Sequence, residues 1–254
     1  NQLNSQIEKL EKKEINISVF GKVGVGKSSL LNALIKKQLF PTDIINGNTK
    51  KIQTYQWSQS FKNFSQVNLI DTPGIDEATD NKDAQLAFNY SLNADLILFI
   101  VDSDLTRIEL HAIEKLINQN KPIFLILNRC DQWNKKEAES ILYSIKEKLS
   151  FYKKRINISL AASSPRKAKF KDNGRIRSEP TTPKVKTFTE NLKDIIDIEG
   201  DFLLAINSLR VADQFYKLLK EDRLRRNKEA AQSLIGKYAA LKASGVAINP
   251  LLII

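Results

Sequence analysis

The chain has 254 residues, 42% of them hydrophobic, and a formal net charge of +11. This length suits one globular domain of about 150 residues with an appendage. A single cysteine, Cys130, excludes an internal disulfide and suits a reducing cytosol. The single histidine, His111, is expected on a helix surface, so neither a metal cluster nor a Ser-His-Asp triad is predicted.

Residues 1–14 place apolar side chains at helical spacing, which predicts a short amphipathic helix. Residues 15–20 then alternate apolar and polar side chains, as a strand does. The next segment, residues 21–28, reads Gly-Lys-Val-Gly-Val-Gly-Lys-Ser and fits the phosphate-binding pattern G-x-x-x-x-G-K-[ST] at every fixed position. A helix over residues 27–38 is predicted to follow it.

This phosphate loop has a defined chemistry. Its glycines let backbone N–H groups close around phosphate oxygens at a helix N-terminus. Lys27 can reach the β- and γ-phosphates, and the Ser28 hydroxyl can hold Mg²⁺. A plain glycine-rich turn would explain Gly21 and Gly26 but not Lys27 and Ser28. The expected phosphate-binding residues are Gly21, Val23, Gly24, Val25, Gly26, Lys27, Ser28 and Ser29.

Strands are predicted next at residues 51–57 and 66–70, paired antiparallel with each other. The second strand ends in the sequence Asp-Thr-Pro-Gly. Asp71 can hold Mg²⁺ through water, and the Gly74 N–H can meet a γ-phosphate. Further periodicity predicts helices at 81–92, 107–119 and 134–150, and strands at 95–101, 122–127 and 156–160.

Two loops after these later strands indicate guanine. Asp131, in Asn-Arg-Cys-Asp, can accept hydrogen bonds from both N1–H and N2–H of guanine, a pair that adenine lacks. Asn128 can hold N7 and tie down the phosphate loop. A polar loop of this kind is a weak signal alone and a strong one after the two preceding motifs. Last, a backbone N–H in Ala161, Ala162 or Ser163 can read guanine O6.

Strands separated by helices predict an α/β fold. We expect a mostly parallel, six-stranded, doubly wound sheet with helices on both faces and ligands at the strand C-terminal ends. Residues 15–164, through these four motifs, resemble the Era-like branch of the P-loop GTPases. The resemblance implies binding of GTP or GDP with Mg²⁺ and hydrolysis to GDP and phosphate. Arg129 stands where that family usually has lysine, and its guanidinium can stack on guanine.

The resemblance also indicates the switch segments. Residues 47–49, Gly-Asn-Thr, are similar to the first switch of Era-like proteins, so Thr49 is expected to sense the γ-phosphate, with Thr42 and Thr54 as rivals. The implied catalytic residues are Lys27, Thr49 and Gly74, and the implied Mg²⁺ ligands are Ser28, Thr49 and Asp71. Ile75 follows the second motif where Ras-like GTPases have glutamine. Hydrolysis must therefore use another group, a water network or a partner, and slow turnover is expected.

Residues 165–199 are predicted as a basic segment, in which residues 165–185 form a mobile linker or an insertion, followed by the last helix of the domain at 186–197. The residues between 165 and 186 are strongly basic, and a second basic cluster comprises Arg223, Arg225, Arg226 and Lys228. Such clusters suit solvent, an anionic membrane surface or RNA. The sequence lacks the aromatic-rich pattern of RNA-binding modules.

Residues 200–254 are expected to form a helical extension, with helices at about 200–230 and 229–247. These helices carry more apolar residues than two isolated helices can bury, so they should pack on the GTPase domain, on each other or on a second copy. Residues 236–250 are similar to the start of a domain of unknown function fused to many bacterial Era-like GTPases. That resemblance implies membrane-associating helices that continue beyond residue 254.

Two functions follow from these expectations. The first is a cytoplasmic GTP-hydrolysing switch, peripheral to or anchored at a membrane, with a possible homodimer through the GTPase face or the helical tail. The alternative is an RNA- or ribosome-assembly GTPase of the Era type. RNA is the less favoured partner because the tail has no G-x-x-G loop. A nucleotide-binding scaffold without hydrolysis is a third possibility, supported only by Ile75.

Overall fold

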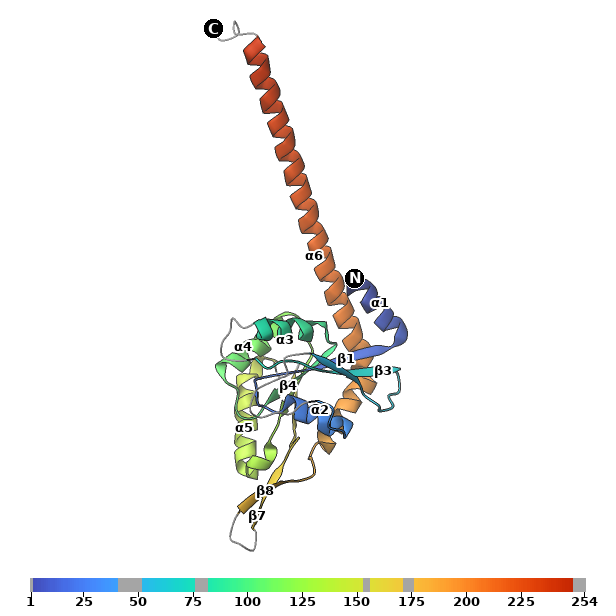
Figure 1. Ribbon diagram of the computed structural model, residues 1–254, viewed down its shortest axis with the longest axis vertical. Helices are drawn as coiled ribbons and strands as arrows, with labels where there is room; N and C mark the ends of the chain where they lie inside the picture. Colours follow the sequence, from blue (N-terminus) through green and yellow to red (C-terminus); the bar gives the residue numbers. More distant parts are fainter. Residues whose placement is uncertain (1, 41–51, 76–81, 153–155, 171–175, 249–254) are drawn as a thin grey trace. The chain divides into compact units, whose positions relative to one another are not determined.

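The computed structural model describes residues 2–40, 52–75, 82–152, 156–170 and 176–248 (Figure 1). The helices are α1 (Gln2–Lys12), α2 (Lys27–Ile35), α3 (Lys82–Asn93), α4 (Arg107–Asn118), α5 (Lys135–Lys148) and α6 (Lys186–Ile248), with short 3-10 turns at Cys130–Gln132 and Ser150–Tyr152. The strands are β1 (Glu14–Phe20), β2 (Gln53–Gln56), β3 (Gln66–Asp71), β4 (Leu96–Val101), β5 (Ile123–Leu127), β6 (Ile156–Leu160), β7 (Arg166–Phe170) and β8 (Ile176–Pro180).

The main sheet has six strands in the order β2-β3-β1-β4-β5-β6. All neighbouring pairs are parallel except β2 and β3, which run antiparallel as predicted. The central strand β4 is buried at every position because both faces of a parallel sheet are covered by helices. The carboxyl ends of β1, β3, β4, β5 and β6 therefore meet at one edge, where the predicted motifs lie.

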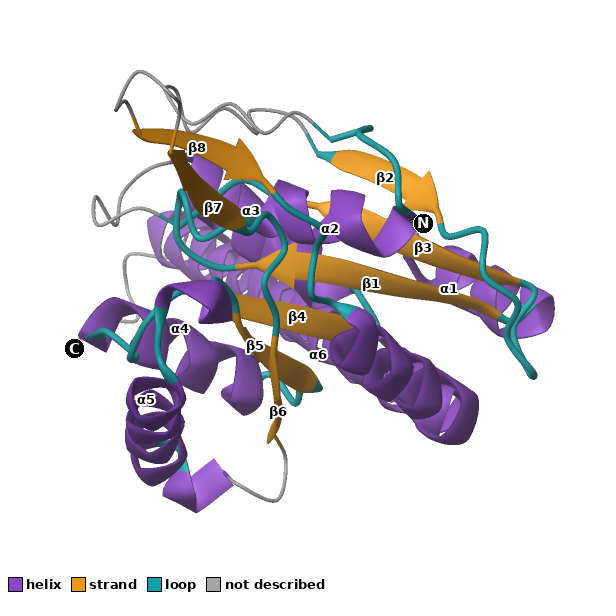
Figure 2. Cartoon of the chain, turned by 90° about the horizontal axis from the view of Figure 1, so that it is seen from below, coloured by secondary structure: helices purple, strands orange, loops and turns teal. Residues whose placement is uncertain are grey.

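Two apolar cores lie on the two faces of this sheet (Figure 2). One core contains side chains of α2 and of the beginning of α6, among them Leu31, Phe188 and Leu204. The other contains side chains of α3, α4 and α5, among them Ile113 and Ile145. The doubly wound α/β fold expected from the sequence is confirmed.

The end of α2 differs from the prediction. The helix stops at Ile35 rather than near residue 38, because Lys36 adopts the left-handed conformation with a φ of 56°. The Asn32 side chain then accepts hydrogen bonds from the N–H groups of Leu39 and Phe40, both at 2.9 Å, and donates to the Phe40 carbonyl at 2.8 Å. This buried amide replaces the last helical turn and directs the chain back toward the sheet.

The segment at residues 165–185, for which we expected a mobile linker or an insertion, contains strands that the sequence did not predict. Strands β7 and β8 form an antiparallel hairpin there, with Lys169 opposite Arg177 and Ala168 opposite Ser178. Lys169 also forms an ion pair with Glu179 at 3.3 Å. Most side chains of this segment are charged or polar, so the alternation of apolar and polar residues that marks a strand is weak. Such a weak alternation is typical of a hairpin whose strands are largely exposed to solvent.

The expected break between two C-terminal helices is also absent. The helix α6 runs for 63 residues from Lys186 to Ile248. No proline occurs in that range, and its glycines are tolerated within a helix at a modest cost. The chain divides into two compact units within this helix, residues 1–208 and residues 209–254.

The second unit exposes many apolar side chains. Those at least 43% exposed are Leu209, Phe215, Tyr216, Leu218, Leu219, Leu224, Leu234, Ile235 and Tyr238. Ion pairs one helical turn apart join Lys217 to Asp213 at 2.7 Å and Arg226 to Asp222 at 2.9 Å. Across the described ranges, no helix combines the length and apolarity needed to cross a bilayer.

Candidate functional site

The phosphate loop, residues 21–28, joins the carboxyl end of β1 to the first turn of α2. Gly26 has a φ of 92°, in the left-handed region that favours glycine. A Cβ atom at Gly26 would lie 2.5 Å from Nδ2 of Asn128, so a side chain would also collide with the neighbouring loop. Gly26 is therefore required both by its backbone conformation and by the close approach of a second loop.

The Lys27 side chain lies inside this loop and is only 7% exposed. Its ammonium donates hydrogen bonds to the carbonyls of Gly21, at 3.1 Å, and Lys22, at 2.8 Å. The charge is thus held at the mouth of the loop by two backbone dipoles. Phosphate oxygens are stronger acceptors for an ammonium group than these neutral carbonyls.

Ser28 and Asp71 lie together, although they are 43 positions apart in the sequence. The Ser28 hydroxyl donates to Oδ2 of Asp71 at 2.6 Å. Burial raises the pKa of Asp71 above its ordinary value, and the hydrogen bond from Ser28 and the charge of Lys27 offset part of that rise. The other oxygen, Oδ1, is buried without a hydrogen-bond partner.

This donor set fits Mg²⁺, which prefers a few protein oxygens completed by water and phosphate. The unpaired Asp71 Oδ1 is an acceptor that a hydrated cation could satisfy. Among the described residues, no three His, Cys, Asp or Glu side chains gather into a metal site of their own. A cation here would therefore depend on oxygens of the bound nucleotide as well as on Ser28 and Asp71.

The second motif packs tightly on the phosphate loop. A Cβ atom on Gly74 would lie 2.7 Å from the backbone nitrogen of Val23, so only glycine fits. The Ile75 N–H donates to the Gly21 carbonyl at 3.1 Å. The Ile75 side chain is 7% exposed and belongs to the core that contains Phe20. It therefore points into the core and presents no group that could orient a water molecule.

Asn128 joins three parts of the site. Its side-chain N–H₂ donates to the Val25 carbonyl at 2.9 Å and to the Ser163 hydroxyl at 3.0 Å. Its Oδ1 accepts from the Ser163 N–H at 3.0 Å. The first of these bonds is the link to the phosphate loop that we expected from the sequence. The fully buried amide thus fixes the position of the phosphate loop relative to the loop that follows β6.

The other residues of the base loop, residues 128–131, differ in burial. Asp131 is exposed, and Cys130 is partly buried, where burial raises the pKa of its thiol. Arg129 donates to the Gly24 carbonyl through Nη2 and to Oδ2 of Asp102 through Nη1 at 3.0 Å. The sequence did not nominate Asp102, although its place directly after β4 at the ligand edge was a usable signal.

The loop after β6 carries an unexpected pairing. The Ala162 N–H donates to the Lys184 carbonyl at 3.0 Å, and the Lys184 N–H donates back to Ala162 at 2.8 Å. The Ala161 N–H donates to Leu127, at 2.9 Å, and the Ser163 N–H to Asn128. The backbone N–H groups of Ala161, Ala162 and Ser163, which we expected to bind guanine O6, therefore all donate to acceptors within the protein. One of these hydrogen bonds would have to break before its N–H group could donate to O6.

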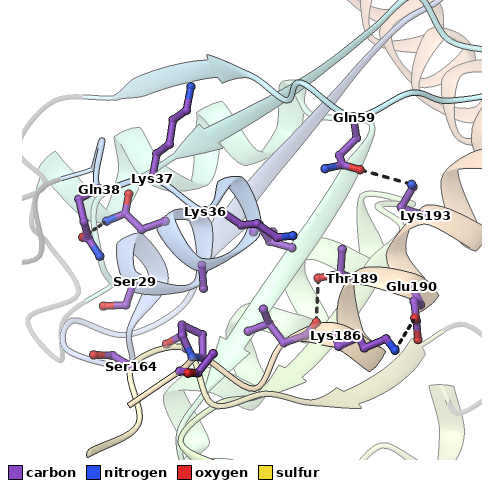
Figure 3. A pocket seen from close by; sticks show the side chains of 17 residues that line it. Ser29, Lys36, Lys37, Gln38, Gln59, Ser164, Lys186, Thr189, Glu190 and Lys193 are labelled. Carbon is purple, nitrogen blue, oxygen red and sulfur yellow. Dashed lines mark hydrogen bonds and ion pairs between the residues drawn. The ribbon is translucent and has the colours of Figure 1, made fainter. Parts of the chain in front are cut away.

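A cavity of about 810 Å³ lies beside the phosphate loop, between α2 and the beginning of α6 (Figure 3). Ser29 and Ser163 line it, and both are expected nucleotide-binding residues. Four lysines also line it: Lys36, Lys37, Lys186 and Lys193. Glu190 pairs with Lys186 at 3.9 Å, so the positive charge is only partly balanced. This side of the site favours an anionic ligand.

The proteins to which this chain is similar are GTPases, in agreement with the arrangement of the phosphate loop and the base loop. Residues 16–129 match the family described as 50S ribosome-binding GTPase. The chain is 30% identical over 145 residues to GTPase Der of Geotalea daltonii, an alignment that covers 51% of this chain and 30% of that protein. Residues 16–129 are thus similar to the GTPase domain of this family, and the six-stranded sheet has the fold of a P-loop GTPase. It spans about a third of the length of that curated relative.

Solved structures show the same GTPase fold. A variant of Aquifex aeolicus Era bound to GDP.AlF4- superposes with a TM-score of 0.52 and 24% identity, covering 59% of this chain and 52% of that one. A structure of an oligomerised bacterial dynamin pair has a TM-score of 0.53 and 17% identity, covering 98% of this chain and 56% of that one. At these identities the likeness concerns the fold.

Some expected residues of the GTPase domain lie outside the described ranges. These are Thr49 and its rival Thr42, and residues 76–81 of the segment that follows Gly74. The other rival, Thr54, lies in β2, where it pairs with Ile70. The His111 side chain is exposed on α4, as predicted.

Proposed function

We propose that this chain binds GTP with Mg²⁺ and hydrolyses it to GDP and phosphate, acting as a nucleotide-dependent switch. The observation that carries the proposal is the buried Asn128 amide, which joins Val25 of the phosphate loop to Ser163. One side chain thereby holds the phosphate end and the base end of the site at a fixed separation. Such preorganisation is the main requirement of phosphoryl transfer, where positioning and electrostatics supply most of the catalysis.

Each of these motif residues then has a role toward the nucleotide. The Lys27 ammonium exchanges its two carbonyl partners for β- and γ-phosphate oxygens. Ser28, Asp71 and Thr49 would hold a Mg²⁺ ion, and that ion would supply positive charge that offsets the charge of the phosphates. The Gly74 N–H donates to the γ-phosphate, so nucleotide hydrolysis changes the contacts of the segment that follows it.

Intrinsic hydrolysis by this arrangement is slow. The buried, apolar Ile75 side chain cannot orient the attacking water, a role that a glutamine has in Ras. Another group, a water network or a partner must supply that contact. A binding partner that supplies the missing contact would therefore determine how long the protein stays bound to GTP.

Nucleotide selectivity tests the proposal. We expect the unchanged protein to bind GTP at least a hundredfold more tightly than ATP in a calorimetric titration, because adenine lacks the N1–H and N2–H donors that the Asp131 carboxylate would accept from. Asp131→Asn should shift the preference toward xanthine nucleotides, since the amide can no longer accept from both guanine N–H groups. Lys27→Ala should abolish tight binding of any nucleotide. Equal affinities for GTP and ATP would contradict the assignment.

For the output of the switch, we propose contact between the distal part of α6 and an anionic membrane surface. The support is chemical: this segment exposes large apolar side chains such as Phe215 and Tyr238 beside a basic stretch containing Arg223 and Lys228. Asp222 pairs with Arg225 and Arg226, which reduces the positive charge without cancelling it. RNA is the second candidate, supported by the exposed basic hairpin of β7 and β8.

Liposome flotation and RNA pull-down separate these two outputs. On the membrane proposal, the protein floats with anionic vesicles, floats less at high salt, and responds to GTP in place of GDP. Replacement of Leu218 and Leu219 by serine should reduce flotation. Binding to structured RNA but to no vesicle would favour the second candidate.

A further inference from the structure

The side chain of Arg129 connects two elements that the nucleotide would also connect. Its Nη2 donates to the backbone carbonyl of Gly24, in the phosphate loop, and its Nη1 donates to the carboxylate of Asp102 at 3.0 Å. Both acceptors are met at the edge of the planar guanidinium group. The two faces of the group remain for stacking on a base.

Asp102 is well placed to fix this arrangement. It follows Val101, which pairs with Leu127 in the neighbouring parallel strand, and the Asn128 N–H donates to the Val101 carbonyl at 2.8 Å. Arg129 itself has a φ of 58°, a left-handed conformation uncommon for a residue with a side chain. The backbone thus directs Arg129 away from the line of β5, and the carboxylate of Asp102 lies where its guanidinium ends.

We propose that Asp102 is a positioning residue for guanine-nucleotide binding, which holds the Arg129 guanidinium between β4 and the phosphate loop. A guanidinium on a long, flexible stem needs two acceptors to define its plane, and Gly24 supplies only one. Without Asp102, Arg129 loses the orientation that clamps Gly24 and presents a face to the base. The inference rests on the proposed function, because it assigns Asp102 a part in the same site.

The competing account is an ordinary surface ion pair. The side chains of Arg129 and Asp102 are 42% and 29% exposed, and exposed pairs contribute little to folding stability. That account predicts no effect on nucleotide binding. A matched control lies two residues away: Asp104 also follows β4, but its carboxylate accepts from Lys148 and Ser144 of α5, both at 2.8 Å.

A double-mutant cycle tests the proposal on the full chain. The dissociation constants for GTP and GDP and the release rate of a fluorescent GDP are measured for the unchanged protein, Asp102→Ala, Arg129→Ala and the double variant. We expect Asp102→Ala to weaken both nucleotides and to speed release about tenfold, in the range of a hydrogen bond to a charged group. In the Arg129→Ala background the same change should have less than a twofold effect, because no guanidinium remains for Asp102 to orient.

Asp104→Ala should leave nucleotide affinity within twofold of the unchanged protein, and thermal melting checks that every variant is folded. If Asp102→Ala binds within twofold of the unchanged protein, or weakens binding equally in both backgrounds, the inference is overturned while the proposed function stands. If the unchanged protein binds no guanine nucleotide, the proposed function itself fails, and this inference with it.

Discussion

The two parts of the helix α6 differ in how far their apolar side chains are exposed to solvent. Between Lys186 and Ser208 the helix buries Phe188, Leu192 and Leu204 in a core of the sheet. From Leu209 onward, large apolar side chains such as Phe215 and Leu218 are exposed, although Val211 is buried. One continuous helix thus contains a segment stabilised by tertiary packing and a segment whose own core contacts are missing. Helical continuity alone therefore does not indicate where a folded domain ends.

Two glycines of the helix show the same contrast. A Cβ atom on Gly200 would collide with the ring of Phe64, which is itself 7% exposed. A Cβ atom on Gly236 would meet nothing within 4 Å. The first glycine is required by close packing, whereas the second only weakens the helix. Substitutions in the packed part of the helix, each matched by one in the exposed part, test this contrast.

The largest effect is expected at Asn207. Its amide donates to the carboxylate of Asp95 at 2.6 Å and accepts from the ammonium of Lys121 at 2.6 Å, and all three side chains are buried. Asn207→Leu would leave two buried charges without this partner and should lower the free energy of unfolding by about 3–5 kcal/mol. Denaturant titration measures the change. Asn227→Leu, an exposed site of the distal segment, should change it by less than about 0.5 kcal/mol.

Gly200→Ala should have the next largest effect. The added methyl group forces the buried Phe64 ring or the helix to move, which costs about 1–3 kcal/mol in a packed core. Phe64→Leu would make room and should recover part of the loss in the double variant. An unchanged melting temperature for Gly200→Ala would show that the contact is loose.

A smaller effect should appear in the pH dependence of stability. Burial raises the pKa of Asp95 above its ordinary 3.8, and the charge of Lys9 and the hydrogen bond from the Asn16 N–H offset part of that rise. The folded protein then binds the proton more tightly than the unfolded chain, so stability gained at low pH is lost as the pH rises through the raised pKa. Asp95→Asn removes this titration. The unfolding free energy of the unchanged protein, relative to the variant, should therefore increase on acidification toward pH 3.8.

Asp71 has a pKa raised in the same direction, but it titrates in both proteins and cancels from this difference. Parallel pH profiles for the unchanged protein and Asp95→Asn would contradict the prediction. The profiles are measured by denaturant titration at a series of pH values, in constant salt.

The smallest effect is expected at Gly236, with the opposite sign. Gly236→Ala removes a flexible residue from an open helical position and should stabilise the distal helix by up to about 1 kcal/mol. The helical signal in circular dichroism should persist to a higher temperature. A loss of helix would mean that Gly236 lies against a partner in solution.

Local patterns predicted the sheet, its antiparallel edge and the placing of the nucleotide motifs, because each of these depends on short spacings of apolar or glycine residues. The contacts of Asp102, Lys184 and Asn207 could not be predicted in that way. Each joins residues far apart in the chain, and nothing adjacent to Asn207 distinguishes it from a surface asparagine of a helix. The hairpin of β7 and β8 was not predicted, because its many charged residues leave little alternation of apolar and polar side chains.

The buried Asn207 amide has a consequence for how a signal can pass along α6. Its oxygen faces a cation and its nitrogen faces an anion, so the site accepts one residue type in one orientation. If the helix slid by one turn along its axis, Leu203, Leu204, Arg210 or Val211 would take that place. The apolar residues would leave the buried charges of Asp95 and Lys121 without their partner, and Arg210 would add a further buried charge. A sliding movement of α6 across the sheet would therefore break these contacts, whereas a movement of the helix together with the sheet would keep them.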